Sequence, residues 1–240
     1  MRPVRHAPAE RASRGTGIVV DGVSHRFGDR PVLHDVDLVL TERRIGIVGS
    51  NGSGKSTLAR LLNGLVVPTS GRVRVDGLDT RRDGAAVRRR VGFVFTDPDA
   101  QIVMPTPAED VAFSLRRNGL PRAELDRQVA RTLERFGLAD HADAPAHLLS
   151  GGQKQLLALA AVLVTSPSVL VCDEPTTLLD ARNARGVARL LSQLPQRVVL
   201  VTHAVEQLRD FDRVIVLDDG RVVADGAPQA ALAAYEEVLR

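Results

Sequence analysis

The sequence predicts an α/β protein built on a parallel β-sheet, to which an antiparallel β layer and a helical lobe are added. Three observations carry this prediction. From residue 150 onward, short apolar runs alternate with helical stretches, as parallel βαβ units require. The N-terminal part instead has strand alternation in closely spaced segments, and residues from about 105 to 149 have a helical pattern.

Composition limits the size and class of the protein. The chain has 240 residues, 44% of them hydrophobic and 25% charged, which favours one large domain or a domain with a lobe. The net charge is only +3, and aromatic residues make up 3%, too few for base stacking, so we expect no nucleic-acid partner. The single cysteine, Cys172, excludes an internal disulfide and favours a reducing cytoplasm.

The N-terminal segment differs from the rest. Residues 1–16 are rich in Arg, Ala and Pro and lack the apolar stretch of a signal peptide, so we expect a flexible tail there and an ordered domain over residues 17–240. No segment approaches the roughly 20 apolar residues that span a bilayer. Any membrane role is therefore predicted to be peripheral.

The expected elements follow from local patterns. Strand alternation predicts an antiparallel layer from residues 17–27, 31–40 and 72–77. Residues 123–138 have helical spacing that ends near Gly137, which places a helix in the expected lobe. Later apolar runs predict parallel strands at residues 168–175, 197–203 and 213–220.

The segment RIGIVGSNGSGKST at residues 44–57 carries the strongest chemical signal. An apolar strand runs into a loop with the spacing G-x-x-x-x-G-K-[ST] and then into a helix. Glycines leave backbone amides free to surround phosphate oxygens, and the helix adds its positive end. The predicted nucleotide-binding residues are Gly49, Ser50, Asn51, Gly52, Ser53, Gly54, Lys55, Ser56 and Thr57. Lys55 is predicted to reach the β and γ phosphates and Ser56 to ligate Mg²⁺.

The segment SVLVCDEP at residues 168–175 provides acidic groups. Four apolar residues carry Asp173 to the end of a strand, where α/β folds bind ligands, and Asp173 is expected to hold Mg²⁺ through water. Glu174 is the expected general base for a water that attacks the γ phosphate. His203 ends another strand and is expected to contact the γ phosphate.

A second anion site is predicted at the start of an apolar helix. Ser150, Gly151, Gly152 and Gln153 combine a hydroxyl, bare backbone amides and a helix N-terminus. One nucleotide cannot fill two distant phosphate sites on one chain. A dimer resolves this, with the Ser150 loop of one copy covering the γ phosphate that Lys55 of the other copy holds.

Together these segments resemble the ATP-binding subunits of ABC transporters over nearly the whole chain from residue 17. GSNGSGKST resembles Walker A, LSGGQ the family signature, VLVCDEP Walker B and TLLD the D-loop. The resemblance implies a P-loop ATPase with a RecA-like core, and His203 as its switch histidine. It also implies that Phe27 stacks on adenine, although a buried core position is the alternative for that ring. Where the family has the Q-loop glutamine, this chain has Thr96, which is expected to reach Mg²⁺ only through water.

A narrower resemblance concerns residues 98–102. PDAQI is similar to a segment of energy-coupling factor (ECF) transporter ATPases that lines the groove for the coupling helices of a membrane protein. It implies that Asp97, Asp99 and Gln101 serve partner docking. The resemblance to the ATPase of the biotin member of that class rests on three segments, FTDPDAQIVMPT, SGGQKQLLALA and DEPTTLLD. The implied partners are an integral-membrane coupling protein and a small membrane substrate-binding protein.

Several alternatives remain open at this point. An importer for cobalt, nickel or another vitamin fits the same motifs, and a soluble ABC protein outside transport fits them less well. The dimer could be a homodimer or a heterodimer with a related ATPase. The expected ligands are ATP and Mg²⁺, and the expected location is the cytoplasmic face of the membrane.

Overall fold

The computed structural model describes residues 17–240 and divides them into two compact units. One unit holds residues 17–91, 169–173 and 195–240, and the other holds residues 92–168 and 174–194. The tail predicted for residues 1–16 lies outside the described residues. Among residues 17–240, no helix is both long and apolar enough to cross a bilayer.

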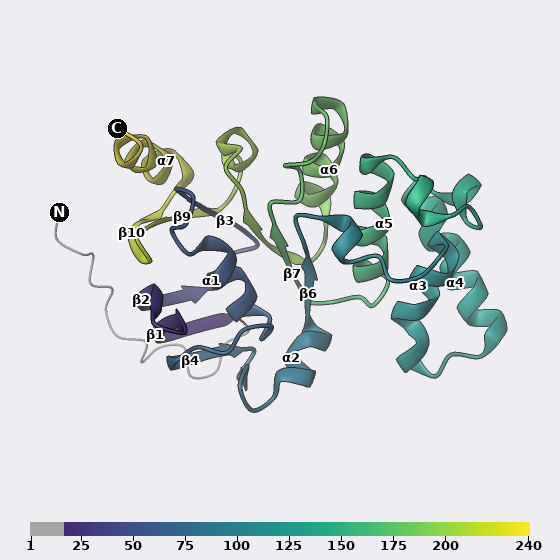
Figure 1. The fold of residues 1–240 in the computed structure, drawn as a ribbon, viewed down its shortest axis with the longest axis horizontal. Helices are drawn as coiled ribbons and strands as arrows, with labels where there is room; N and C mark the ends of the chain where they lie inside the picture. The colour runs from purple at the N-terminus through teal and green to yellow at the C-terminus, as the bar shows by residue number, and fades with distance from the viewer. Residues whose placement is uncertain (1–16) are drawn as a thin grey trace. The chain divides into compact units, whose positions relative to one another are not determined.

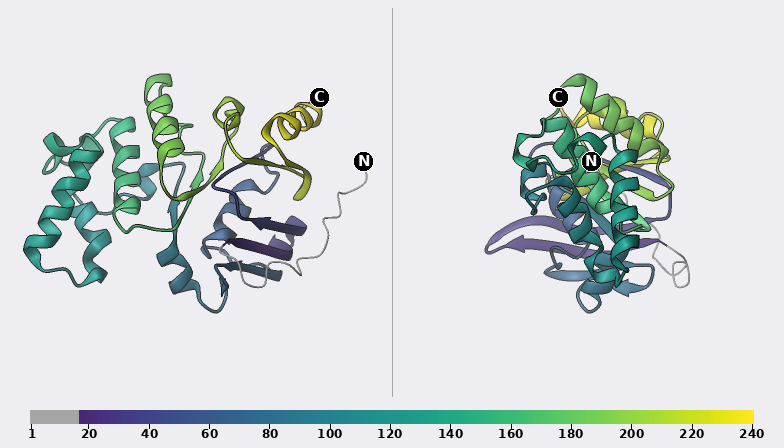
Figure 2. Two further views of the ribbon diagram at one scale, coloured as in Figure 1. Left: turned by 180° about the vertical axis from the view of Figure 1, so that it is seen from behind. Right: turned by 90° about the vertical axis from the view of Figure 1, so that its right-hand side faces the viewer.

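The first unit contains the predicted antiparallel layer. Its strand order is β2-β1-β4-β5, and β1 pairs with both β2 and β4 in antiparallel fashion. The two long strands β1 and β2 run side by side in both views of Figure 2. Ile18, Val20 and Val23 are buried, which is the apolar pattern that predicted the first strand. The strands are β1 (Ile18–Phe27), β2 (Arg30–Leu40), β4 (Ser70–Val75) and β5 (Leu78–Asp79).

The second sheet of this unit is the predicted parallel core. Within the unit its strands lie in the order β10-β9-β3-β8-β7. Neighbours from β9 to β7 are parallel, whereas β10 pairs with β9 as an antiparallel hairpin. Every residue of β3 and β7 is buried, which explains their unbroken apolar runs. The bounds are β3 (Arg44–Gly49), β7 (Val169–Asp173), β8 (Arg197–Val201), β9 (Arg213–Asp218) and β10 (Arg221–Gly226).

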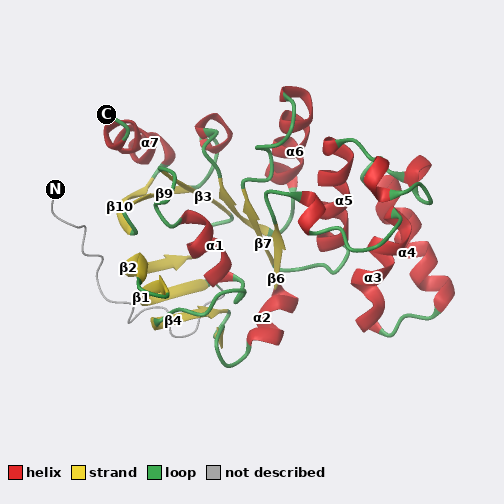
Figure 3. Cartoon of the chain, in the orientation of Figure 1, coloured by secondary structure: helices red, strands yellow, loops and turns green. Residues whose placement is uncertain are grey.

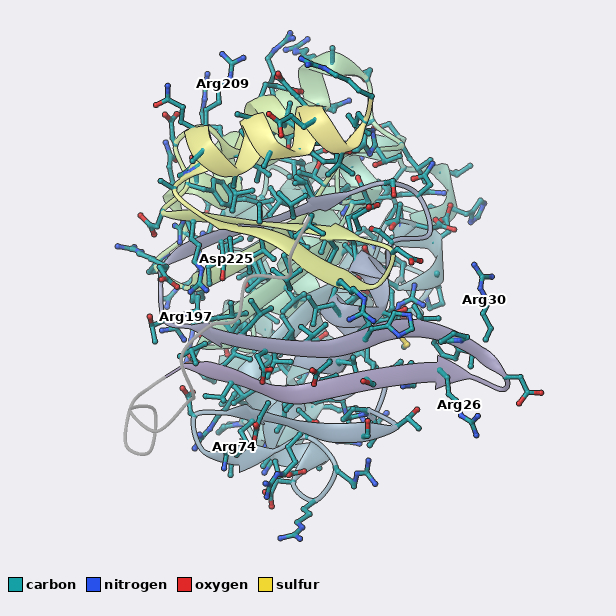
Figure 4. The ribbon with its side chains drawn as sticks, turned by 90° about the vertical axis from the view of Figure 1, so that its left-hand side faces the viewer. Arg26, Arg30, Arg74, Arg197, Arg209 and Asp225 are labelled. Atoms are coloured by element: carbon teal, nitrogen blue, oxygen red, sulfur yellow. The ribbon has the colours of Figure 1, made fainter. Side chains whose placement is uncertain are left out.

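Three helices belong to the first unit. Helix α1 (Lys55–Leu62) contacts strands of both sheets (Figure 1), and α2 (Gly84–Arg90) follows β5 in the chain. Helix α7 (Pro228–Val238) packs on β9 and β10, as Figure 4 shows with Asp225 labelled on β10. The Arg213 guanidinium on β9 donates to Asp225 at 2.6 Å and to Glu42 at 3.2 Å. These bonds tie the β9–β10 hairpin to Glu42, two residues beyond the end of β2.

The second unit is mainly helical (Figure 3). Helices α3 and α4 lie in the range where the helical lobe was expected. The predicted helix over residues 123–138 is α4, which ends earlier, since Gly137 has a φ of +67°. The elements are β6 (Val91–Val94), at which the unit begins, the 3₁₀ helix η1 (Pro98–Ala100), α3 (Pro107–Leu115), α4 (Arg122–Arg135), α5 (Gly151–Leu163) and α6 (Ala181–Gln193). Three further 3₁₀ turns lie between α3 and α5.

The last residue of β3 is a position where the fold requires glycine. A Cβ on Gly49 would lie 2.1 Å from the Leu217 carbonyl oxygen of the neighbouring strand. We expect Gly49→Ala to lower the free energy of unfolding by about 1–3 kcal/mol, because backbone atoms would have to shift. Gly226→Ala on β10 is the matched control, since a Cβ there meets nothing within 4 Å. Thermal denaturation of both variants tests this, and equal midpoints would contradict it.

Candidate nucleotide-binding site

The loop between β3 and α1 has the shape of an anion cradle. Gly54 ends the loop with a φ of +97°, and a Cβ there would lie 2.9 Å from the Val32 carbonyl oxygen. Gly54 gives α1 no side-chain cap, and the first turn of α1 contains no acidic residue. The amides of that turn therefore keep their positive potential at the end of the loop.

Lys55 closes the loop on itself. Its ammonium donates to the carbonyl oxygens of Gly49 at 2.7 Å and Ser50 at 2.8 Å, and its side chain is largely buried. A buried ammonium needs such partners, and phosphate oxygens offer stronger, charge-assisted acceptors. Lys55 is thus placed to exchange neutral acceptors for anionic ones inside the loop.

Ser53 adds a second sign of a ligand site. Its hydroxyl is buried within the loop and makes no hydrogen bond among residues 17–240. Native proteins rarely leave such a group unsatisfied without a functional reason. The hydroxyl is therefore a donor that a phosphate oxygen could use.

Ser56 and Asp173 are joined directly. Ser56 Oγ donates to Asp173 Oδ1 at 2.8 Å, although the residues lie 117 positions apart in the chain. The Asp173 carboxylate is 2% exposed, and the Arg60 guanidinium lies 3.8 Å from its other oxygen. Sequence reasoning missed Arg60, although its spacing of four residues from Ser56 places it on the same face of α1. A hydroxyl and a carboxylate form the hard oxygen set that Mg²⁺ prefers.

Strand register brings His203 to the same edge of the sheet. Val201 on β8 lies between Asp173 on β7 and Ile47 on β3 in the parallel ladders. His203 comes two residues after Val201, as Gly49 comes two after Ile47, so the phosphate loop, Asp173 and His203 share the carboxyl edge. The His203 side chain is exposed there. This is the edge at which open α/β sheets bind ligands.

Glu174 follows Asp173 in a constrained backbone conformation. Its φ is +53°, which is uncommon for a residue with a side chain, and Thr177 Oγ1 donates to its carboxylate at 2.9 Å. Such conformations cluster at functional sites. The Thr177 hydroxyl therefore fixes the position of one carboxylate oxygen of Glu174.

Phe27 lies at the end of β1 with its ring half exposed. The exposed fraction is 51%, so the alternative of a buried core position is wrong for this residue. The His25 imidazole meets the Phe27 ring edge to face, with ring centroids 4.6 Å apart. Burial lowers the pKa of His25, which favours the neutral form of its imidazole. The exposed ring offers a face to a flat ligand.

The signature residues form an ordered helix start in the second unit. Ser150 and Gln153 make a reciprocal capping box on α5, and Gln153 Nε2 lies 2.7 Å from His141 Nε2. Ser150 and Gly151 are exposed. Gly152 is buried, and a Cβ there would lie 2.5 Å from the Asn183 side chain of α6, so its glycine also serves helix packing.

The segment after β6 makes internal contacts within the second unit. Asp97 caps η1 by accepting from the Asp99 amide at 2.9 Å, and Asp99 accepts from Lys154 of α5 at 2.7 and 3.0 Å. The Gln101 side chain accepts from the Phe95 amide and donates to the Ala158 carbonyl oxygen at 3.3 Å. Thr96 is half buried, two residues beyond β6. This segment is therefore fastened to the signature helix α5.

The fold and the loop define a P-loop nucleoside triphosphatase. The model of the ABC transporter family matches residues 33–177. A Deinococcus radiodurans protein, named only as an ABC transporter ATP-binding protein, is 55% identical over 90% of this chain and 95% of its own. The biotin transport ATP-binding protein BioM of Rhizobium etli is 46% identical over 90% and 96% of the two chains. EcfA1 of Symbiobacterium thermophilum, an ECF transporter ATP-binding protein, is 44% identical over 92% and 83%.

Solved structures agree with this assignment. The structure of cbiO1 from Clostridium perfringens, part of the ABC transporter complex cbiONQ, has a TM-score of 0.79, 31% identity and 92% coverage of both chains. A dimeric structure of the ATP-binding cassette MJ0796 bound to ADP and Pi has a TM-score of 0.78 and 28% identity, covering 88% of this chain and 98% of that one. This chain belongs to the ABC transporter family. It binds ATP and is an ATPase.

Replacing Lys55 tests whether the loop is the phosphate site. In Lys55→Ala the buried ammonium is lost, so we expect nucleotide affinity to fall at least about tenfold, as for removal of a charge-assisted contact. Calorimetric titration with Mg-ATP measures the dissociation constant. Lys154→Ala is the control, because it removes the only other lysine and lies in the second unit. Unchanged affinity in Lys55→Ala would contradict the assignment.

Proposed function

We propose that this chain is the ATP-hydrolysing subunit of an ECF-type importer, with biotin as the favoured cargo. The proposed ATP hydrolysis rests on the 2.8 Å hydrogen bond between Ser56 and Asp173, which lies beside Lys55 at the carboxyl edge of a parallel sheet. The proposed role in import rests on similarity to ATP-binding proteins of transporters. The chain resembles BioM of Rhizobium etli and EcfA1 of Symbiobacterium thermophilum along most of its length.

In this proposal the loop binds the phosphates of ATP. The loop amides and the Ser53 hydroxyl donate to phosphate oxygens, and Lys55 leaves the Gly49 and Ser50 carbonyls for the β and γ phosphates. The exposed Phe27 ring stacks on adenine. Ser56 and Asp173 would hold Mg²⁺, which neutralises phosphate charge when bound. Thr96 is a further candidate, through a bridging water.

Hydrolysis then needs a base and a positioned water. Glu174 accepts the proton as the oxygen of water bonds to the γ phosphorus, and the bond to the bridging oxygen breaks so that this oxygen leaves with ADP. His203, at the same sheet edge as Asp173, contacts the γ phosphate and orients the attack. The Thr177 hydroxyl, bonded to Glu174 at 2.9 Å, sets the direction of its carboxylate.

Two copies complete each site. The exposed Ser150 and Gly151 on α5 form a donor surface that would cover the γ phosphate bound by the other copy. ATP then stabilises the closed dimer, and hydrolysis releases it, so ATP drives transport through its different affinity for the two states. A dimeric relative bound to ADP and Pi supports this arrangement. A homodimer is the simplest form, and a heterodimer with a related ATPase would use the same contacts.

Transport requires membrane partners. We propose an integral-membrane coupling protein that docks near η1 and a separate small membrane protein that binds the cargo, with this subunit peripheral on the cytoplasmic face. Asp97, Asp99 and Gln101 would form part of the docking surface, where exposed carboxylates can meet arginines. A cargo other than biotin is the second candidate, because the chain also resembles cbiO1. This candidate has less support, because the chain is 31% identical to cbiO1 and 46% identical to BioM.

Glu174→Gln tests the base and the dimer together. The amide keeps the size of the side chain but cannot accept the proton, so we expect turnover to fall about a hundredfold or more while Mg-ATP still binds. The variant should accumulate as an ATP-bound dimer. Turnover assays and size-exclusion chromatography with Mg-ATP measure both effects. A strictly monomeric variant with normal turnover would refute the base and the dimer.

Asp99→Arg tests docking in the assembled transporter. Reversing this charge should uncouple ATP hydrolysis from biotin uptake by at least about tenfold, because an arginine would repel arginines of the partner. Uptake by cells and ATPase activity of the purified complex give the ratio.

The matched control for this variant is Lys154→Met. It breaks the same ion pair but leaves the Asp99 carboxylate in place. Normal coupling in Lys154→Met with loss in Asp99→Arg supports docking. Equal loss in both would assign Asp99 to holding η1 on α5 instead. If biotin uptake does not depend on this subunit, biotin is rejected as the cargo.

A further inference from the structure

The only tyrosine of the chain reaches the phosphate loop from the C-terminal helix. Tyr235 lies on α7, one turn beyond the buried Ala231, and its side chain is 6% exposed. Its hydroxyl donates to the Gly49 carbonyl oxygen at 3.3 Å, across 186 positions of sequence. Helix α7 otherwise packs on β9 and β10, so this bond connects it to the nucleotide site.

The same carbonyl is an acceptor for Lys55. Lys55 Nζ lies 2.7 Å from the Gly49 oxygen, so this one atom accepts from both the ammonium and the Tyr235 hydroxyl. Lys55 and Tyr235 are expected to behave differently when nucleotide binds. Lys55 must move from the carbonyl toward phosphate, whereas Tyr235 is held by the packing of α7.

We propose that Tyr235 is a positioning residue for nucleotide binding, which keeps the Gly49 carbonyl satisfied when Lys55 leaves it for the phosphates. This inference rests on the assignment of the phosphate loop in the proposed function. Gly49 and Lys55 are both buried, and a buried carbonyl that loses a donor without replacement costs free energy. The Tyr235 hydroxyl reduces that cost in the bound state and thereby favours release of Lys55.

We expect Tyr235→Phe to weaken nucleotide binding without destabilising the protein. The phenylalanine ring still fills the place between α7 and the sheet, so the stability of the variant should stay close to that of the wild type. The dissociation constant for Mg-ATP and KM should rise about threefold to tenfold, the usual effect of one lost hydrogen bond, and kcat should change less than about twofold. A role in packing alone would instead lower the melting temperature and leave affinity unchanged.

Calorimetric titration with Mg-ATP, beside thermal denaturation, measures affinity and stability. Thr132→Val is the matched control, because the Thr132 hydroxyl also donates to a backbone carbonyl, at 2.7 Å, but lies on α4 in the other unit. It should bind Mg-ATP with wild-type affinity. Lys55→Ala separates the two hypotheses. Wild-type affinity in Lys55→Ala would reject the phosphate site, whereas lost affinity there with unchanged affinity in Tyr235→Phe would reject only the role of Tyr235.

Tyrosine fluorescence provides a second, spectroscopic test. The chain has one tyrosine and no tryptophan, so intrinsic emission reports on Tyr235 alone. Titration of the wild type with Mg-ADP, corrected for adenine absorption with free tyrosine, should give a saturable change whose midpoint equals the calorimetric dissociation constant. Lys55→Ala should already differ in emission without nucleotide, because the second donor to Gly49 is absent. Unchanged emission at saturating Mg-ADP would overturn the inference.

Discussion

The hydrogen bond between Ser56 and Asp173 depends on three parallel strands ending at one edge of the sheet. Ile47 on β3 and Asp173 on β7 both pair with Val201 on β8, so the start of α1 and the end of β7 meet after a separation of 117 residues. Slipping either strand by one residue would turn its side chains to the opposite face. The site therefore depends on the register of a core that is buried on both faces.

The same edge explains the chemistry of the loop. Gly49 and Gly54, at its two ends, lie so close to neighbouring backbone oxygens that an added Cβ would fall only 2.1 Å and 2.9 Å from them. A buried lysine held by two carbonyls and a buried serine hydroxyl are costly arrangements in isolation. In the function proposed above, phosphate oxygens would accept from both groups, which would link the stability of the loop to its ligand.

Much of this could be predicted from the sequence because the signals are local. The phosphate loop has fixed spacing, Asp173 ends an apolar run, and strands separated by helical stretches indicate a parallel sheet. Contacts that depend on tertiary packing could not be predicted, because no local sequence pattern indicates them. The bond from Tyr235 to Gly49 spans 186 residues, and the pair of Asp99 with Lys154 depends on how η1 meets α5. The edge-to-face contact of His25 with Phe27 joins residues two apart, yet an exposed Phe27 could not be distinguished from a core position without the sheet.

A crystal structure of Glu174→Gln with Mg-ATP would test the proposed site most directly. We expect two copies, with each nucleotide between the phosphate loop of one and Ser150 of the other. We also expect Lys55 to bond to the β and γ phosphates instead of the Gly49 and Ser50 carbonyls that it contacts here at 2.7 and 2.8 Å. A nucleotide enclosed by a single copy, or bound with Lys55 still on those carbonyls, would refute the proposed composite site.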